Sequence, residues 1–235
     1  MLAFNDQPRA DRVIVALDCD RHTALDLAKK LQGHAKWLKV GMTLYYAEGP
    51  AIIEIFKLLG YNVFLDLKFH DIPHQVAGAA ASAVNAGADM VTMHAVGGVP
   101  MMQAAQKSVD EADTDAATLA ITVLTSMDDA TLAKTGVERG MEEQVKALAE
   151  CAKEAGLTGV VASPREAEML RELLGPDAFI VTPGVRPAGA DLGDQSRVAT
   201  PKAAFDNGAS HIVVGRPITQ AEDPVAAFDA IAASL

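Results

Sequence analysis

Short, unbroken apolar runs alternate along this chain with longer segments in which apolar residues recur at helical spacing. The runs lack the apolar–polar alternation of strands with one exposed face, and such runs are typical of parallel strands buried on both faces. We predict eight strands, at residues 13–17, 37–40, 62–67, 90–94, 119–124, 159–162, 179–182 and 211–214.

The segments between these runs are predicted to be helices. Apolar residues recur every three or four positions within 24–31, 145–152 and 167–174, which places them on one helix face. Glycines fall near several predicted helix ends, where a left-handed cap favours this residue. They are Gly33, Gly60, Gly87, Gly156, Gly175 and Gly208.

Eight strand–helix units fill the 235 residues and leave no room for a second domain. Their number and the chain length favour the α/β class and, within it, a single (β/α)8 TIM barrel over residues 1–235. A doubly wound open sheet is the alternative fold, because local alternation does not show that a sheet closes. Two long connections without a core pattern, residues 127–140 and 184–200, are predicted to be functional loops.

The composition narrows the class of protein. Half of the residues are hydrophobic and the formal net charge is −11, so the chain can bury a large core but repels nucleic-acid phosphates. The first eleven residues show no signal-peptide pattern, and no stretch approaches the roughly 20 apolar residues that span a bilayer. Cys19 and Cys151 are far apart and are typical of reduced thiols. We therefore expect a cytoplasmic protein without a nucleic-acid or membrane partner.

Charged and polar residues gather at the ends of the predicted strands. In a (β/α)8 barrel the active site lies at the carboxyl ends of the strands, and strand interiors normally avoid Asp and Lys. This distribution predicts an enzyme. The residues at these ends are Asp18, Lys39, Asp66, Lys68, Asp71, His94, Thr125, Ser126, Arg186, Gly215 and Arg216.

The third predicted strand ends in Asp66, Lys68 and Asp71. Asp66 and Lys68 are two residues apart, so on a strand their side chains point to the same side. A lysine between carboxylates keeps its proton, and in a water-poor pocket it can deliver that proton to a developing carbanion. A structural ion-pair network at a strand end is the alternative interpretation.

A second group of residues indicates a phosphate site. Gly215 and Arg216 follow the eighth predicted strand, and phosphate sites in this fold commonly use the loops after strands seven and eight. Glycine lets the backbone approach the anion and arginine adds a bidentate contact, although an arginine can also simply bridge loops. His94 is either a general base or a packed residue at a strand end, and the histidines show no metal-ligand spacing.

Residues 66–73, Asp66-Leu67-Lys68-Phe69-His70-Asp71-Ile72-Pro73, closely resemble the signature of the orotidine 5′-phosphate decarboxylase family. One such motif is weak alone, but the others follow in the family's order and spacing over nearly the whole chain. They lie at residues 15–18, 38–41, 123–127, 182–187, 193–195 and 214–218.

The resemblance implies an enzyme that converts orotidine 5′-monophosphate to uridine 5′-monophosphate in de novo pyrimidine biosynthesis, with no metal or other cofactor. It also implies a homodimer with shared active sites, in which Asp71 reaches the site of the other subunit. Lys68 would protonate C6 of the pyrimidine after carbon dioxide leaves, within a charged array that includes Asp66 and Lys39.

The resemblance further implies a lid over residues 184–195, whose closure would be driven by remote phosphate binding. The implied substrate-binding residues are Asp18 and Lys39 for the ribose, Thr125 or Ser126 for the base, and Gln195, Gly215 and Arg216 for the phosphate, with Arg186 nearby.

One position departs from the family pattern, because His74-Gln75 stand where the family usually has Asn-Thr. The threonine would reach the neighbouring subunit's ligand, and we expect glutamine to keep this contact in altered form.

Two other functions stay open at this stage. Relatives with the same D-x-K-x-x-D pattern act on sugar phosphates with a magnesium ion, and residues 70–73 together with the 182–195 segment argue against them. A non-catalytic nucleotide-binding barrel is the other alternative, against which the intact charged residues of the third strand end count.

Overall fold

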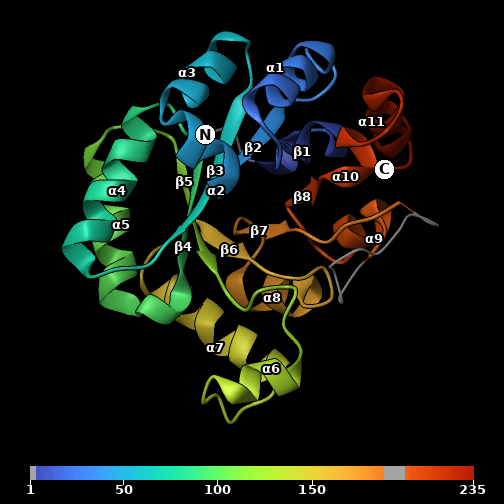
Figure 1. The fold of residues 1–235 in the computed structure, drawn as a ribbon. Coiled ribbons are helices and arrows are strands. Elements are labelled where there is room, and N and C mark those ends of the chain that lie inside the picture. The colour runs from blue at the N-terminus through green and yellow to red at the C-terminus, as the bar shows by residue number, and fades with distance from the viewer. Residues whose placement is uncertain (1–3, 188–198) are drawn as a thin grey trace.

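In the computed structural model, which describes residues 4–187 and 199–235, eight parallel strands close into one barrel. Each strand pairs with the next along the chain, and β8 pairs with β1 (Figure 1). The predicted (β/α)8 TIM barrel is confirmed, and the open sheet is excluded. The strands are β1 Val13–Ala16, β2 Trp37–Gly41, β3 Asn62–Phe69, β4 Met90–His94, β5 Ala117–Ile121, β6 Gly159–Val161, β7 Phe179–Thr182 and β8 His211–Val214.

Helices surround the strands on the outside of the barrel (Figure 1). All six glycines predicted near helix ends have positive φ. Among the described residues, no helix is long and apolar enough to cross a membrane. The α-helices are α1 Arg21–Lys30, α2 Met42–Glu48, α3 Ala51–Leu58, α4 Pro73–Asn85, α5 Val99–Glu111, α6 Asp129–Lys134, α7 Met141–Glu154, α8 Ala167–Leu174, α9 Pro201–Asp206, α10 Arg216–Thr219 and α11 Pro224–Ala233; the 3-10 helices are η1 Phe4–Asp6, η2 Arg9–Arg12 and η3 Ala95–Gly97.

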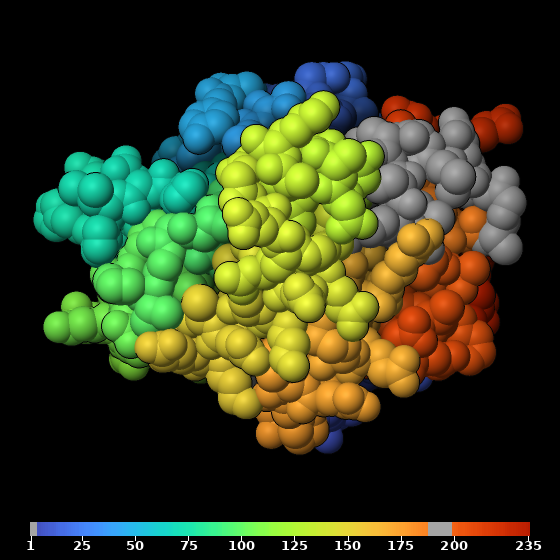
Figure 2. Space-filling view, turned by 90° about the horizontal axis from the view of Figure 1, so that it is seen from below, coloured from blue at the N-terminus to red at the C-terminus, as the bar shows by residue number. Residues whose placement is uncertain are grey.

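The predicted elements differ most from the structure at two places. The fifth strand was expected at residues 119–124 but spans Ala117–Ile121, because its apolar run continues past the strand end into the wall of a cavity. The expected loop at 127–140 contains α6, which begins after the N-cap Asp128 and buries only Leu132. A helix with one buried position leaves no apolar period to recognise. Its segment, yellow-green in Figure 2, forms the middle of the face seen there.

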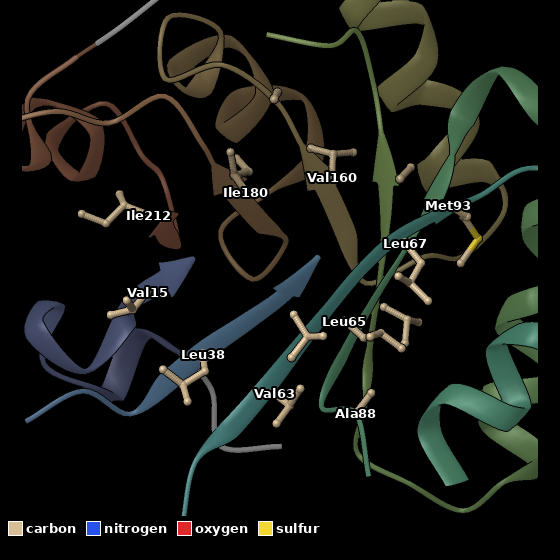
Figure 3. Packing of buried hydrophobic residues seen from close by; sticks show 14 of the residues in the cluster. Val15, Leu38, Val63, Leu65, Leu67, Ala88, Met93, Val160, Ile180 and Ile212 are labelled. Atoms are coloured by element: carbon tan, nitrogen blue, oxygen red, sulfur yellow. The ribbon is translucent and has the colours of Figure 1, made fainter. Parts of the chain in front are cut away.

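Side chains of each strand alternate between two sets of buried residues. One set packs between the strands and the helices, and Figure 3 shows Val15, Leu38 and Val63 in it. The other set, which includes Ile14, Phe64 and Met90, forms a separate cluster from alternate strand positions and fills the barrel interior. The barrel is therefore a packed core rather than a pore.

An aromatic group closes the amino-terminal end of the barrel. Phe4 packs edge-on against Phe179 at 5.3 Å between ring centroids, and His211 stacks on Phe179 at 5.2 Å. Phe179 and His211 are the first residues of β7 and β8, so these rings lie where the strands begin. Aromatic rings therefore fill the barrel interior at this end.

Candidate active site

A cavity of about 610 Å³ lies at the carboxyl ends of the strands. Its size is within the usual range for small-molecule sites, and its lining is partly apolar and partly charged. Eight of the predicted site residues line it: Asp18, Lys39, Asp66, Lys68, Thr125, Arg186, Gly215 and Arg216.

Four charged side chains, in or just after the first three strands, form a continuous row in this cavity. Nζ of Lys39 lies 2.9 Å from Oδ1 of Asp18 and 3.6 Å from Oδ2 of Asp66. Nζ of Lys68 lies 2.9 Å from the same Oδ2 of Asp66. Negative and positive groups therefore alternate along the row, from Asp18 through Lys39 and Asp66 to Lys68.

The two central groups of this row are buried, and their neighbours decide their charge. Burial alone would lower the pKa of Lys39, but the carboxylates of Asp66 and Asp18 outweigh it and raise this pKa above its ordinary value. Burial alone would raise the pKa of Asp66, but Lys39 and Lys68 outweigh it and lower this pKa. Both groups therefore stay charged at neutral pH.

Lys68 reaches Asp66 from an unusual backbone. Its φ is +55°, and Lys68 and Asp113 are the two non-glycine residues with positive φ in the described part of the chain. The pairing of β3 with β4 shifts register between Leu65 and Phe69. The two side chains meet as predicted, but a β-bulge brings them together instead of the plain alternation of a strand.

The expected phosphate-binding residues lie at the side of the cavity formed by the ends of β7 and β8. Gly215 is the N-cap of α10 and Arg216 is its first residue, and Arg186 follows β7. The Arg186 side chain is largely buried, and its Nη1 donates to the carbonyl of Val185 at 2.9 Å. Gln195 lies outside the described residues, as does most of the expected lid at 184–195.

Several predicted residues are not found in the cavity wall of a single chain. Asp71 is exposed just before α4, and its Oδ1 accepts the backbone N–H of Ile72 at 2.7 Å. His74 and Gln75 are exposed in the first turn of α4. Within the ranges 4–187 and 199–235, the lining includes neither Asp71 nor Ser126.

His94 packs beside His70 instead of facing the cavity. The two ring centroids lie 5.6 Å apart, and His94 is half-buried at the end of β4. Burial, followed by the charges of His70 and Lys68, lowers the pKa of His94. This arrangement favours the interpretation of His94 as a packed strand-end residue.

The cavity also contains polar residues that the sequence did not single out. Thr23 of α1, Thr219 of α10 and the following Gln220 contribute to its wall. Polar residues at helix ends are normally solvated, so their type and spacing carried no signal. Within the residues that the structure describes, no group of three or more His, Cys, Asp or Glu is arranged to hold a metal ion.

Comparison with known proteins identifies the family. The model of the orotidine 5′-phosphate decarboxylase / HUMPS family matches residues 11–231. The chain belongs to this family. A relative named orotidine 5′-phosphate decarboxylase from Moorella thermoacetica is 52% identical over 235 residues, which covers 96% of this chain and 92% of the relative. One of the same name from Pseudoalteromonas translucida is 48% identical over 220 residues, which covers 93% and 94%.

Solved structures agree with this assignment. The crystal structure of orotidine 5′-phosphate decarboxylase from Lactobacillus acidophilus superposes with a TM-score of 0.84 at 40% identity and covers 94% of this chain and 97% of that one. The resemblance inferred from residues 66–73 and the other motifs is therefore confirmed at the level of the family.

Proposed function

We propose that this chain is an orotidine 5′-phosphate decarboxylase, a carbon–carbon lyase that forms uridine 5′-monophosphate in de novo pyrimidine biosynthesis. The observation that carries the proposal is the alternating row of Asp18, Lys39, Asp66 and Lys68 in a cavity of about 610 Å³. Membership of the family and the names of relatives that cover nearly the whole chain support it.

The reaction needs a group that stabilises a carbanion and then protonates it. The bond between C6 and the carboxylate breaks, carbon dioxide leaves, and the electron pair stays on C6. The ammonium of Lys68 stabilises this charge and transfers a proton to C6, after which water reprotonates the amine. Asp66, held in its charged form, keeps the ammonium in place at 2.9 Å.

The proposal also includes an orientation of the substrate in the cavity. Asp18 and Lys39 bind the ribose hydroxyls, and Thr125 contacts the base. The phosphate lies at the far side of the cavity, against the backbone of Gly215 and the guanidinium of Arg216. Arg186 and Gln195 complete the substrate-binding residues. The chain supplies the positive charge and the proton itself, so the proposal includes no metal and no organic cofactor.

We extend the proposal to a homodimer in which each subunit supplies Asp71 to the other's site. Asp71 is exposed in the single chain, whereas a carboxylate that completes the charged row has to lie in a cavity. The cavity of a neighbouring subunit would meet this requirement. The next residue, Ile72, is 63% exposed, and apolar side chains that follow the carboxyl ends of β2 and β4 are exposed as well: Tyr46 at 75%, Met42 and Val96. Such side chains at the site's end of the barrel suit a second copy of the chain.

Two further features complete the proposal. Residues 1–235 form one catalytic domain, which the family match over 11–231 and a barrel closed between β1 and β8 support. The enzyme works in the cytoplasm, where nucleotides are made.

The test is the loss of orotidine 5′-monophosphate absorbance on addition of purified protein in excess chelator. We expect conversion to uridine 5′-monophosphate, identified by chromatography, at the same rate with and without chelator. A well-folded protein that gives no conversion would refute the proposed function. Turnover of a sugar phosphate only when magnesium is added would instead assign the chain to the metal-dependent relatives.

A further inference from the structure

We propose that Thr92 is a positioning residue that fixes both partners of the Asp66–Lys68 pair, an inference that rests on the function proposed above. Thr92 lies in β4, its side chain is fully buried, and it is not among the described residues that line the cavity. Its hydroxyl oxygen accepts the backbone N–H of Lys68 at 2.9 Å and donates to Oδ1 of Asp66 at 3.1 Å.

The β-bulge in β3 explains why this hydroxyl is needed. Leu65 pairs with Val91 and Phe69 pairs with Met93, so three residues of β3 stand opposite Thr92 alone. A bulge leaves backbone groups without their usual ladder partners, and a buried N–H without an acceptor is destabilising. The Thr92 side chain provides the acceptor for the Lys68 N–H and so holds that residue at φ +55°.

The same hydroxyl also determines how the Asp66 carboxylate is turned. A hydroxyl has one proton to donate, and Lys68 N–H already occupies its acceptor side, so the proton points to Oδ1 of Asp66. The other oxygen, Oδ2, is then the one that contacts Nζ of Lys68 at 2.9 Å and Nζ of Lys39 at 3.6 Å. The Thr92 side chain, which lies outside the cavity, therefore fixes two things. They are the backbone conformation of Lys68 and the orientation of the Asp66 carboxylate that pairs with the Lys68 ammonium.

This role concerns the chemical step more than binding. Proton transfer to C6 requires the ammonium to stay within a narrow range of positions, whereas phosphate and ribose contacts hold the nucleotide from other strands. Loss of the hydroxyl should thus reduce turnover while leaving ground-state binding largely intact. Serine keeps a donor and two lone pairs and can replace threonine, whereas valine matches its shape but makes neither hydrogen bond.

The test compares Thr92→Val with Thr92→Ser by kcat for orotidine 5′-monophosphate and by the dissociation constant of uridine 5′-monophosphate. We expect valine to lower kcat about 10- to 100-fold, the scale for losing a hydrogen bond to a charged group, with binding changed less than about threefold. Serine should restore kcat to within about threefold of the wild type. A valine variant with wild-type kcat, binding weakened as much as kcat, or a serine variant as slow as valine would overturn the proposal.

Amide hydrogen exchange provides a second readout that does not depend on activity. In the valine variant, the Lys68 amide should exchange at least about tenfold faster than in the wild type. The Val63 amide, which donates to Asp89 instead, serves as the control and should not change. Equal exchange at Lys68 in both proteins would overturn the proposal. If the valine variant does not fold, the wild type alone provides the test. A Lys68 amide that shows no protection from hydrogen exchange in the wild type would then overturn the proposal.

These readouts also separate the two proposals. A wild-type protein without turnover would refute the proposed function, and Lys68 exchange would then decide on its own whether Thr92 holds this backbone. An active wild type with a fully active valine variant would refute only the positioning role.

Discussion

Nζ of Lys39 lies 2.9 Å from Oδ1 of Asp18, and Gly41 leaves the space in which the two groups meet. A Cβ on residue 41 would lie 2.8 Å from that oxygen and 3.1 Å from the Lys39 nitrogen. The Gly41 backbone is extended, with φ −90°, so alanine would fit it without strain. The methyl group of Gly41→Ala would displace the carboxylate of Asp18, whose side chain is 63% exposed.

We therefore predict that Gly41→Ala lowers kcat/KM by on the order of tenfold, by disturbing the pair that we propose binds the ribose, with little loss of stability. Steady-state kinetics and thermal unfolding check the two parts. A double-mutant cycle with Asp18→Asn provides the control, because alanine should cost less where the ion pair is already lost. Equal effects of alanine in both backgrounds would show that it acts by another route.

A second prediction concerns the proposed shared site. Lys68→Ala and Asp71→Ala proteins should each be folded and inactive, because each removes one member of the charged array from both sites. After subunit exchange, a mixed dimer has one site with both residues intact, so an equal mixture should recover roughly a quarter of wild-type activity. Subunit exchange followed by mass spectrometry, without recovered turnover, would contradict a site that Asp71 completes across the dimer.

A third prediction concerns the close pairing of β6 with β7 in the barrel. Gly159 pairs with Phe179, and a Cβ on Gly159 would lie only 2.0 Å from the Phe179 carbonyl oxygen. A strand carbonyl cannot move aside without loss of its ladder, so Gly159→Ala should destabilise the fold by about 3 kcal/mol or more. Urea unfolding measures this cost.

Gly78→Ala is the matched control for that substitution. Gly78 lies within α4, and a Cβ there would meet no atom within 4 Å. Alanine should therefore raise stability by about 0.5–1 kcal/mol through helix propensity. A Gly159→Ala protein that unfolds at the same urea concentration as the wild type would contradict the steric explanation.

The fold could be predicted from the sequence because a strand buried on both faces leaves an unbroken apolar run. The same rule misplaced the end of β5, because Val123 and Leu124 are apolar for a different reason, as part of the cavity wall. It also missed α6, where Leu132 is the one buried residue. Apolar patterning reports burial, and burial follows secondary structure only inside the regular core.

The candidate site could be predicted in part. Asp66 and Lys68 were expected to meet because they are two residues apart, and they do, although a β-bulge with a left-handed Lys68 intervenes. No sequence pattern announces such a bulge, and so Thr92, which supports it from the neighbouring strand, had no signal. Contacts that depend on strand register, as this one does, require the three-dimensional pairing.

The last prediction concerns acid stability and the fully buried ring of His211, which stacks on Phe179. Burial, followed by the charge of Arg12, lowers the pKa of His211 from its ordinary value of 6.5 to about 3. In the unfolded chain His211 therefore binds a proton below pH 6.5, whereas in the folded protein it binds one only below about pH 3. The free energy of unfolding therefore falls as the pH decreases from 6.5 to about 3. At pH 5 this one residue should cost about 2 kcal/mol relative to neutral pH.

His211→Gln removes the titrating group, so the variant should lose about 2 kcal/mol less than the wild type between pH 7 and pH 5. The variant also loses the stacking on Phe179, which lowers stability at both pH values and cancels in this difference. Urea unfolding at the two pH values, at one fixed protein concentration because a dimer is expected, measures it. An identical drop in the free energy of unfolding in both proteins would contradict the prediction. It would mean that the buried ring of His211 becomes protonated in the folded barrel.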